Sequence, residues 1–143
     1  MVSKDKIESD LKEALKRRES ERVSVLRLLL SALHNQEIDK GGTLDEQEII
    51  PVVEGEIKKR REAIEGYRSG GREESAISEE HELKILESYL PPQLTDEELE
   101  DIVKRVIGEN PGLPAGPLMG KVKEQVKGKA ESRRVIETIK KLL

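Results

Sequence analysis

The chain lacks cysteine, tryptophan and phenylalanine, and its only aromatic residues are Tyr67 and Tyr89. The absence of cysteine excludes disulfides, thiol catalysis and zinc–thiolate sites. Because aromatic side chains are so scarce, the hydrophobic core must be built from Leu, Ile and Val. The same scarcity leaves nothing for bases to stack on, so we do not expect sequence-specific reading of single-stranded nucleic acid.

Long hydrophobic runs are also missing. No stretch approaches the roughly 18 apolar residues that a membrane-spanning helix requires. The N-terminal segment Met1–Glu8 lacks the apolar region of a secretory signal peptide. We therefore expect a cytoplasmic protein that does not associate with a membrane.

What the sequence does contain is a helical repeat of aliphatic residues. Charged residues make up 39% of the 143 residues, yet apolar positions recur at helical spacing throughout, which indicates a folded, all-α protein. Helices are expected at about residues 4–15, 20–39, 43–69, 73–89, 96–107, 117–127 and 132–142.

Local signals mark several helix ends. Thr43–Glu46 and Thr95–Glu98 both have the pattern of a capping box, and Gly41 with Gly42 ends the second helix. Pro51 either kinks the third helix or lies in the first turn of a helix that restarts there. Gly108–Pro117 has the composition of a linker.

The second helix is apolar on more than one face, which predicts that it is the central, most buried helix.

Pro91 and Pro92 mark a domain boundary. We expect residues 1–90 to form a four-helix, bundle-like domain and residues 91–143 to form a small three-helix domain. A unit of about 50 residues is only marginally stable alone.

Charge is distributed unevenly along the chain. Pro111–Leu143 holds eight positive and three negative residues, a net +5, whereas the preceding 110 residues hold 18 positive and 27 negative, a net −9. A cationic end on an acidic protein indicates a polyanionic partner. The candidate phosphate-binding residues are Lys121, Lys123, Lys127, Lys129, Arg133 and Arg134.

The residues around these cations favour a phosphate ligand. Gly120 and Gly128 allow the backbone to approach a ligand closely, and a helix that starts near Ser132 offers unpaired N–H groups. The alternative, an ordinary solvated helical face rich in lysine, stays open. Arg17, Arg18, Arg22 and Arg27 form a second cationic cluster, for which intramolecular ion pairing is favoured over ligand binding.

No catalytic residues, metal ligands or cofactor-binding motifs can be assigned. His34 lies three residues after Ser31, but no group to orient such a pair is evident, so a surface histidine is expected. His81 begins like a metalloprotease motif but lacks the second histidine four residues later. Neither a phosphate loop nor a dinucleotide fingerprint is present.

Four stretches of the sequence resemble the YqeY family, whose members are small relatives of the tail of the B subunit of glutamyl/aspartyl-tRNA amidotransferase. The stretches are Arg22–Ile38, Glu56–Tyr67, Glu82–Thr95, and Met119–Val122 together with Val126–Glu131. The most specific are the Tyr89–Leu94 joint and the pair formed by Met119-Gly-Lys121 and Lys127-Gly-Lys-Ala130.

The resemblance implies an N-terminal helical bundle and a C-terminal helical domain similar to the amidotransferase tail. It also implies a link to tRNA-dependent amidation, and hence to carbon–nitrogen ligases that use glutamine as amide donor. No amidase nucleophile or ATP site supports such an activity here. We therefore predict a non-catalytic module that binds tRNA or another folded RNA. The alternatives are a module that docks on an amidotransferase or another protein, and an amidotransferase-type enzyme.

Overall fold

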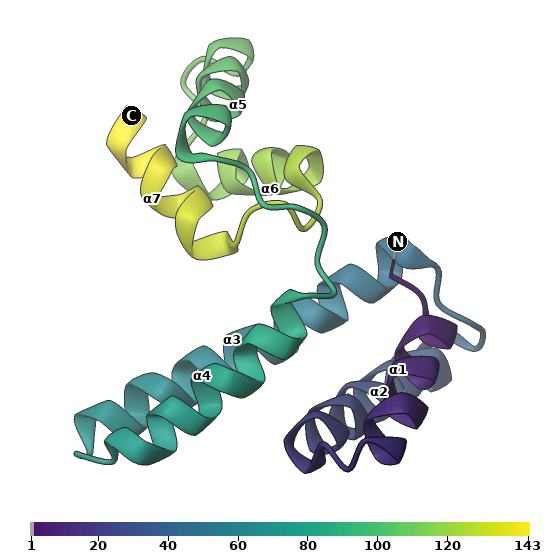
Figure 1. The fold of residues 1–143 in the computed structure, drawn as a ribbon. Coiled ribbons are helices and arrows are strands. Elements are labelled where there is room, and N and C mark those ends of the chain that lie inside the picture. Colours follow the sequence, from purple (N-terminus) through teal and green to yellow (C-terminus); the bar gives the residue numbers. More distant parts are fainter. Residues whose placement is uncertain (1) are drawn as a thin grey trace. The chain divides into compact units, whose positions relative to one another are not determined.

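A computed structural model describes residues 2–143, which form seven α-helices and no strands (Figure 1). The helices are α1 (Lys4–Lys16), α2 (Ser20–Lys40), α3 (Glu46–Ser69), α4 (Glu73–Glu87), α5 (Asp96–Glu109), α6 (Ala115–Val126) and α7 (Ser132–Leu142). The all-α prediction is confirmed. None of the helices in this part of the chain is long and apolar enough to span a bilayer.

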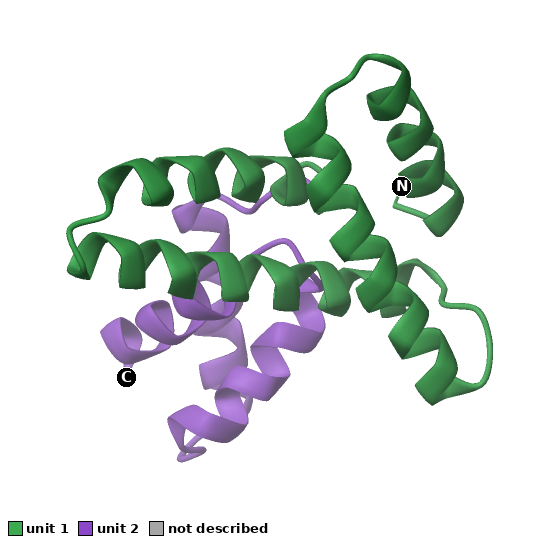
Figure 2. Ribbon diagram, turned by 90° about the horizontal axis from the view of Figure 1, so that it is seen from below, with its two compact units in different colours: residues 1–90 green, residues 91–143 purple. Residues whose placement is uncertain are grey.

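The chain divides into two compact units (Figure 2). Unit 1 comprises the residues up to Leu90, and unit 2 comprises Pro91–Leu143. Each unit has its own cluster of buried aliphatic residues.

Unit 1 consists of two helical hairpins, α1–α2 and α3–α4. The turn between α3 and α4 lies far from α1 and α2 in both views (Figures 1 and 2). Helix α3 has 24 residues and α1 has 13, so α3 is about 36 Å long against about 20 Å for α1, and the α3–α4 hairpin extends beyond α1 and α2.

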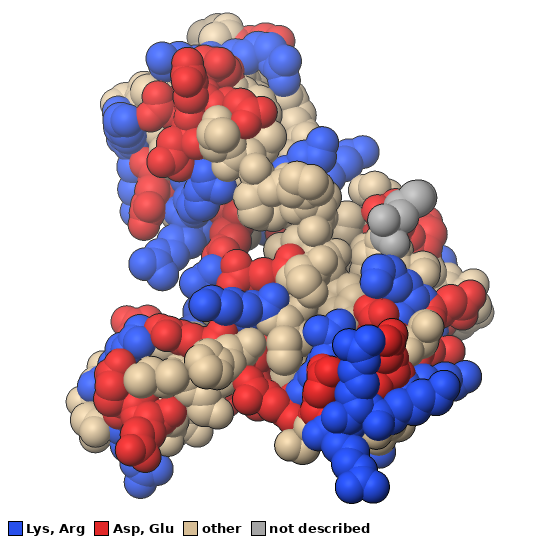
Figure 3. Space-filling view, in the orientation of Figure 1, with Lys and Arg blue, Asp and Glu red and all other residues tan. Residues whose placement is uncertain are grey.

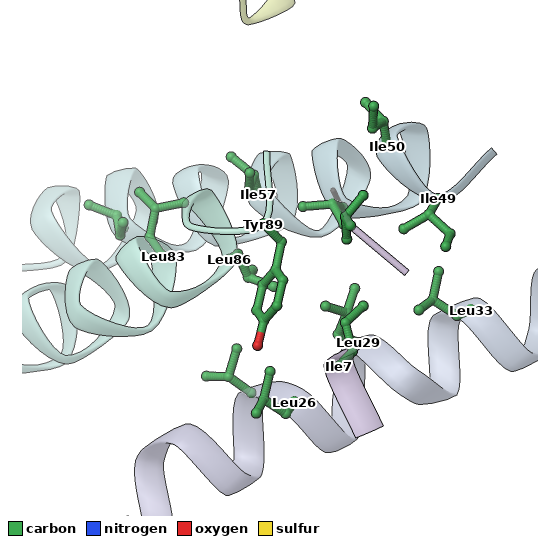
Figure 4. Close-up of a cluster of buried hydrophobic side chains, with 14 of the residues drawn as sticks. Ile7, Leu26, Leu29, Leu33, Ile49, Ile50, Ile57, Leu83, Leu86 and Tyr89 are labelled. Atoms are coloured by element: carbon green, nitrogen blue, oxygen red, sulfur yellow. The ribbon is translucent and has the colours of Figure 1, made fainter. Parts of the chain in front are cut away.

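The core of unit 1 lies where the hairpins meet (Figure 4). Leu26, Leu29 and Leu33 of α2 face Ile49 of α3 and Leu86 of α4, and all five side chains are at most 1% exposed. Aliphatic residues thus fill the core, as the composition requires.

One aromatic residue joins the core of unit 1. Tyr89 is 5% exposed, and its hydroxyl donates to Asp10 Oδ2 at 2.6 Å. Burial, then the bond to Asp10, raises the pKa of Tyr89 above its ordinary value of 10.0. Burial also opposes ionisation of Asp10, but hydrogen bonds from Tyr89 and Lys6 outweigh it, so the pKa of Asp10 is lowered.

The central place predicted for α2 is confirmed, because α2 packs against α1, α3 and α4, but one of its apolar residues stays exposed. The side of α2 that carries Val25, Leu26 and Leu29 is fully buried, but Leu28 is 54% exposed. Helix α2 is contacted by α1 and by the α3–α4 hairpin, and these neighbours leave one side of α2 uncovered. An apolar residue therefore remains uncovered on its outer side.

Helix ends follow local signals with some shifts. The capping box at Thr95 and Glu98 is confirmed. The box expected at Thr43 lies instead at Asp45, whose Oδ1 accepts from the backbone N–H of Glu48 at 2.9 Å. Pro51 lies inside the continuous helix α3, so the helix does not restart there.

The linker expected at Gly108–Pro117 is shorter than predicted. Helix α5 continues through Gly108 to Glu109, and α6 begins at Ala115. Pro117 is accommodated because it lies in the first turn of α6, where a backbone N–H has no helical partner.

Unit 2 packs α5, α6 and α7 against one another. Val103, Val122, Val135 and Ile139 form its centre and are completely buried. Helix α6 turns one side inward, with Leu118, Val122 and Val126 spaced four residues apart. This orientation decides where the neighbouring lysines point.

Candidate nucleic-acid interface

The loop between α6 and α7 is held by the segment that precedes α5. The backbone N–H of Leu94 donates to the carbonyl of Lys129 at 2.7 Å. Gln93 Nε2 donates to the carbonyl of Gly128 at 2.8 Å. Gln93 and Leu94 belong to one of the stretches with the most specific resemblance, and Gly128 and Lys129 to another, so the two stretches are bonded to each other within unit 2. Their shared role is to fix the shape of this loop.

The loop begins with two residues in the left-handed region. Lys127 has φ 39° and Gly128 has φ 83°. Glycine adopts this conformation without cost, but for a residue with a Cβ it costs about 1–2 kcal/mol. The N–H of Lys127 still donates to the carbonyl of Lys123 at 3.1 Å, closing the last turn of α6. A lysine thus occupies the position at which helices most often carry glycine.

Arg134 is turned inward, toward the start of α5. Its Nη2 donates to the carbonyl of Leu94 at 2.8 Å and to Asp96 Oδ1 at 2.9 Å. Its side chain is 30% exposed. The predicted phosphate ligand Arg134 is therefore engaged in holding α7 against the Leu94–Asp96 segment.

Two more of the six cations lie near carboxylates. Arg133 Nε is 3.7 Å from Glu137 Oε1, and both side chains are more than two-thirds exposed, so this pair is weak. The pKa of Glu98 is lowered, first by hydrogen bonds with Thr95 and to a lesser extent by the charge of Lys129. Lys129 accordingly lies in the electrostatic field of the acidic first turn of α5.

The other three lysines are exposed and project from α6 and its C-terminal cap. Lys121, Lys123 and Lys127 form no ion pair in the part of the chain described by the structure. Lys121 and Lys123 lie on opposite sides of the buried Val122, because each is about 100° from it around the helix. Lys123 and Lys127, four residues apart, share one side.

The six predicted residues therefore do not form one symmetrical cradle. Lys123 and Lys127 lie together, Lys121 flanks the other side of α6, and Arg134 points away from solvent into a structural contact. The face of unit 2 seen in Figure 3 carries acidic as well as basic atoms.

Other sites suggested by the sequence do not assemble. His34 and His81 are both exposed. Among residues 2–143, no group of three or more His, Cys, Asp or Glu side chains is placed to hold a metal ion.

The second cationic cluster divides in two. Arg17 pairs with Glu13 at 2.8 Å, and Arg22 lies 4.0 Å from Asp10, as expected for intramolecular ion pairs. Arg18 and Arg27 have no such pair among the described residues. The two unpaired arginines are those that line a hollow beside α2. Sequence reasoning missed this hollow, although the excess of apolar residues on α2 pointed to it.

Comparison with known proteins gives one consistent result. Residues 4–143 match the family model YqeY, described as "Yqey-like protein". Three yeast proteins named "Altered inheritance of mitochondria protein 41, mitochondrial" are similar. The protein of Vanderwaltozyma polyspora is 29% identical over 72% of this chain and 57% of its own length. The protein of Lachancea thermotolerans is 31% identical over 75% of this chain and 61% of its own length. The protein of Kluyveromyces lactis is 29% identical over 81% of this chain and 66% of its own length. The matches thus span less than two-thirds of each relative's length.

The names of these relatives overturn one prediction. The sequence led us to expect a cytoplasmic protein, but the relatives are named as mitochondrial proteins. The error has a simple origin. The lack of an apolar run in Met1–Glu8 does not distinguish one compartment of a cell from another.

Proposed function

We propose that this chain, which belongs to the YqeY-like protein family, is a helical module that binds a folded RNA through the RNA backbone. The resemblance of Pro91–Leu143 to the tail of the amidotransferase B subunit makes tRNA the first RNA to test. In this proposal the module contributes binding and carries out no chemistry of its own.

A single observation supports the proposal: the exposed lysines of α6 and its C-terminal cap form no ion pair within the part of the chain that the structure describes. Lys121, Lys123 and Lys127 form no ion pair among residues 2–143, although unit 2 contains acidic residues that pair with Arg134 and Lys141. Each lysine bound to a phosphate releases counterions, which is the main source of backbone affinity. The few aromatic residues argue for the phosphates rather than the bases as the groups that are recognised.

The geometry narrows the set of expected contacts. Arg134 is set aside as a phosphate contact because it bonds Leu94 and Asp96 within unit 2. Lys129 is set aside because it lies close to the acidic first turn of α5. The strongest candidates are Lys121, Lys123 and Lys127, with Arg133 as a fourth because its pair with Glu137 is long and exposed. Three or four contacts predict a slope of log affinity against log salt of about −2 to −3.5, at roughly 0.7–0.9 per phosphate.

The test is a titration of unmodified tRNA at several salt concentrations. The triple variant Lys121→Gln, Lys123→Gln, Lys127→Gln is expected to bind more weakly and to lower the magnitude of the slope by about 2 to 3. The matched control carries Lys12→Gln, Lys58→Gln and Lys84→Gln, which remove the same charge from exposed positions of unit 1. Wild-type protein that fails to bind tRNA at low salt, or variants that behave alike, would contradict the proposal.

A second candidate function, docking on a protein partner, is favoured by a different observation. Leu15 and Leu28 are 46% and 54% exposed, and both line the hollow beside α2. Association that withstands high salt and nuclease treatment distinguishes this function from RNA binding.

A further inference from the structure

Helix α2 carries a second face that its own unit leaves uncovered. An open hollow of about 550 Å³ lies between the end of α1 and α2. It is lined by Leu15, Arg18, Ser20, Val23, Ser24, Arg27 and Leu28. Its volume falls within the range of about 300–1,000 Å³ that is typical of ligand sites in proteins.

The lining residues of α2 form a regular pattern. Positions 20, 23, 24, 27 and 28 have the spacing of a single helical face. This face lies nearly opposite the one that buries Leu26, Leu29 and Leu33, because the two sets are about 155° apart around the helix at 100° per residue. The hollow is therefore a helix face left without a partner, and not a gap in the core.

The charge of the hollow is positive and uncompensated. Arg18 and Arg27 both line it, and neither forms an ion pair among residues 2–143. No carboxylate lines the hollow. In Figure 3, Lys and Arg atoms gather over the α1–α2 hairpin at the lower right of the view, with Asp and Glu atoms between them.

Arg18 occupies a backbone conformation that does not suit it. Its φ of 56° lies in the left-handed region, where an arginine costs about 1 kcal/mol or more relative to glycine. A glycine would make the turn between α1 and α2 at lower cost. Among residues 2–143, Arg18 forms no ion pair that would offset this cost.

We propose that the hollow binds an acidic amphipathic helix of a partner protein. Leucine-type side chains of that helix would pack on Leu15, Val23 and Leu28. Its carboxylates, one turn away, would pair with Arg18 and Arg27. An apolar floor with arginine at the edge has the composition of a helix-binding groove, since arginine is enriched and lysine depleted at protein interfaces.

Three other occupants fit less well. Two exposed leucines offer nothing to phosphates, which argues against nucleic acid. A second copy of this chain docking through the same face would bring arginines against arginines, which opposes self-association. The hollow is open to solvent along α2, whereas a small molecule requires a site that encloses most of its surface.

The experiment is a selection of displayed 16-residue helical peptides against the full-length chain. The selected peptides are expected to carry leucine, isoleucine or methionine at positions i, i+3 or i+4, and i+7. They should also carry Asp or Glu one helical turn from these apolar residues. A winning peptide is then synthesised, labelled, and titrated against variants by fluorescence anisotropy. Binding is expected to weaken at least tenfold for Arg27→Glu and for Leu28→Asp, and less than twofold for the control Arg72→Glu. Arg72 is a matched control because it is an exposed arginine of unit 1 without an ion pair among the described residues.

Several outcomes decide the matter. Amide shifts on peptide addition that centre on Val23, Ser24 and Leu28 support the assignment, with circular dichroism verifying that each variant is folded. The proposal is overturned by peptides that are basic or uncharged, or by affinity that Arg27→Glu leaves unchanged. It is also overturned by tRNA displacing the peptide from the hollow, or by a dimer that Leu28→Asp dissociates. None of these readouts depends on the lysines of α6, so RNA binding and peptide docking fail independently.

Discussion

Arg133 and Arg134 are neighbours in the sequence, yet the structure gives them opposite expected roles. Arg134 bonds the carbonyl of Leu94 at 2.8 Å and Asp96 at 2.9 Å, whereas Arg133 has one exposed contact at 3.7 Å. We expect Arg134→Met to destabilise unit 2 and to leave the salt dependence of tRNA binding unchanged. Arg133→Met should leave the stability of unit 2 nearly unchanged and should reduce the salt dependence of tRNA binding.

The magnitude follows from the two contacts of Arg134. A hydrogen bond from a charged donor to a carbonyl contributes about 1.5–3 kcal/mol, toward the lower end where water can replace the donor. The ion pair adds about 0–1 kcal/mol, because Asp96 is 93% exposed. Arg134→Met should therefore cost about 1.5–2.5 kcal/mol of unfolding free energy, while methionine preserves the packing of the aliphatic stem. Arg133→Met should cost less than about 0.5 kcal/mol and reduce the salt slope by about 0.7–0.9.

Urea unfolding followed by circular dichroism at 222 nm measures the stability of both variants. Tyr67 and Tyr89 both belong to unit 1, so tyrosine fluorescence serves as an internal control that unit 1 is unaffected. Equal stabilities of the two variants, together with a smaller salt slope for Arg134→Met, would refute the reasoning. Arg134 would then be a phosphate ligand whose contact with α5 is incidental.

Three further predictions concern single positions. Lys127→Gly should stabilise unit 2 by about 1 kcal/mol in urea titrations, because it relieves the left-handed backbone, and should lower the salt slope of tRNA binding by about 0.8. Unchanged stability would show that the backbone at this position is not strained. Tyr89→Phe should destabilise unit 1 by about 1–2 kcal/mol at pH 7, since it removes the bond to ionised Asp10. The pKa of Asp10 is lowered in the folded protein from its ordinary value of 3.8. Ionised Asp10 therefore stabilises the fold above pH 3.8, and this stabilisation is lost as the pH falls through the folded-state pKa. The destabilisation caused by Tyr89→Phe should accordingly shrink in acid. An effect of Tyr89→Phe that stays constant from pH 7 to below the folded-state pKa of Asp10 would contradict this reasoning. Asp45→Ala should lower the thermal midpoint at a cost of about 1 kcal/mol, whereas Thr43→Ala should change it little; the opposite order would restore the capping box first expected at Thr43.

The helix boundaries that were predicted wrongly show where a local sequence pattern is not enough to place a helix end. Thr43-x-x-Glu46 and Asp45-x-x-Glu48 overlap, and both satisfy the capping pattern. In the structure Asp45 caps the helix, and the local pattern alone did not choose between the two boxes. The glycines and prolines of Gly108–Pro117 suggested a long linker, but packing of Val106 and Leu118 extends helix into both of its ends.

The sequence by itself determined the helices and the composition of the cores. Periodic Leu, Ile and Val, the cap at Thr95 and the glycines after α2 and α3 act over one or two turns, so they can be read without a fold. Only the tertiary structure decided which charges and apolar groups remain free. Arg133 and Arg134 look alike in the sequence, as do Leu28 and Leu29. The packing of α7 on the Leu94–Asp96 segment ties down one arginine, and the position of α1 and the α3–α4 hairpin around α2 covers one leucine and leaves the other exposed. Such differences arise from contacts between residues far apart in the chain, which no local pattern encodes.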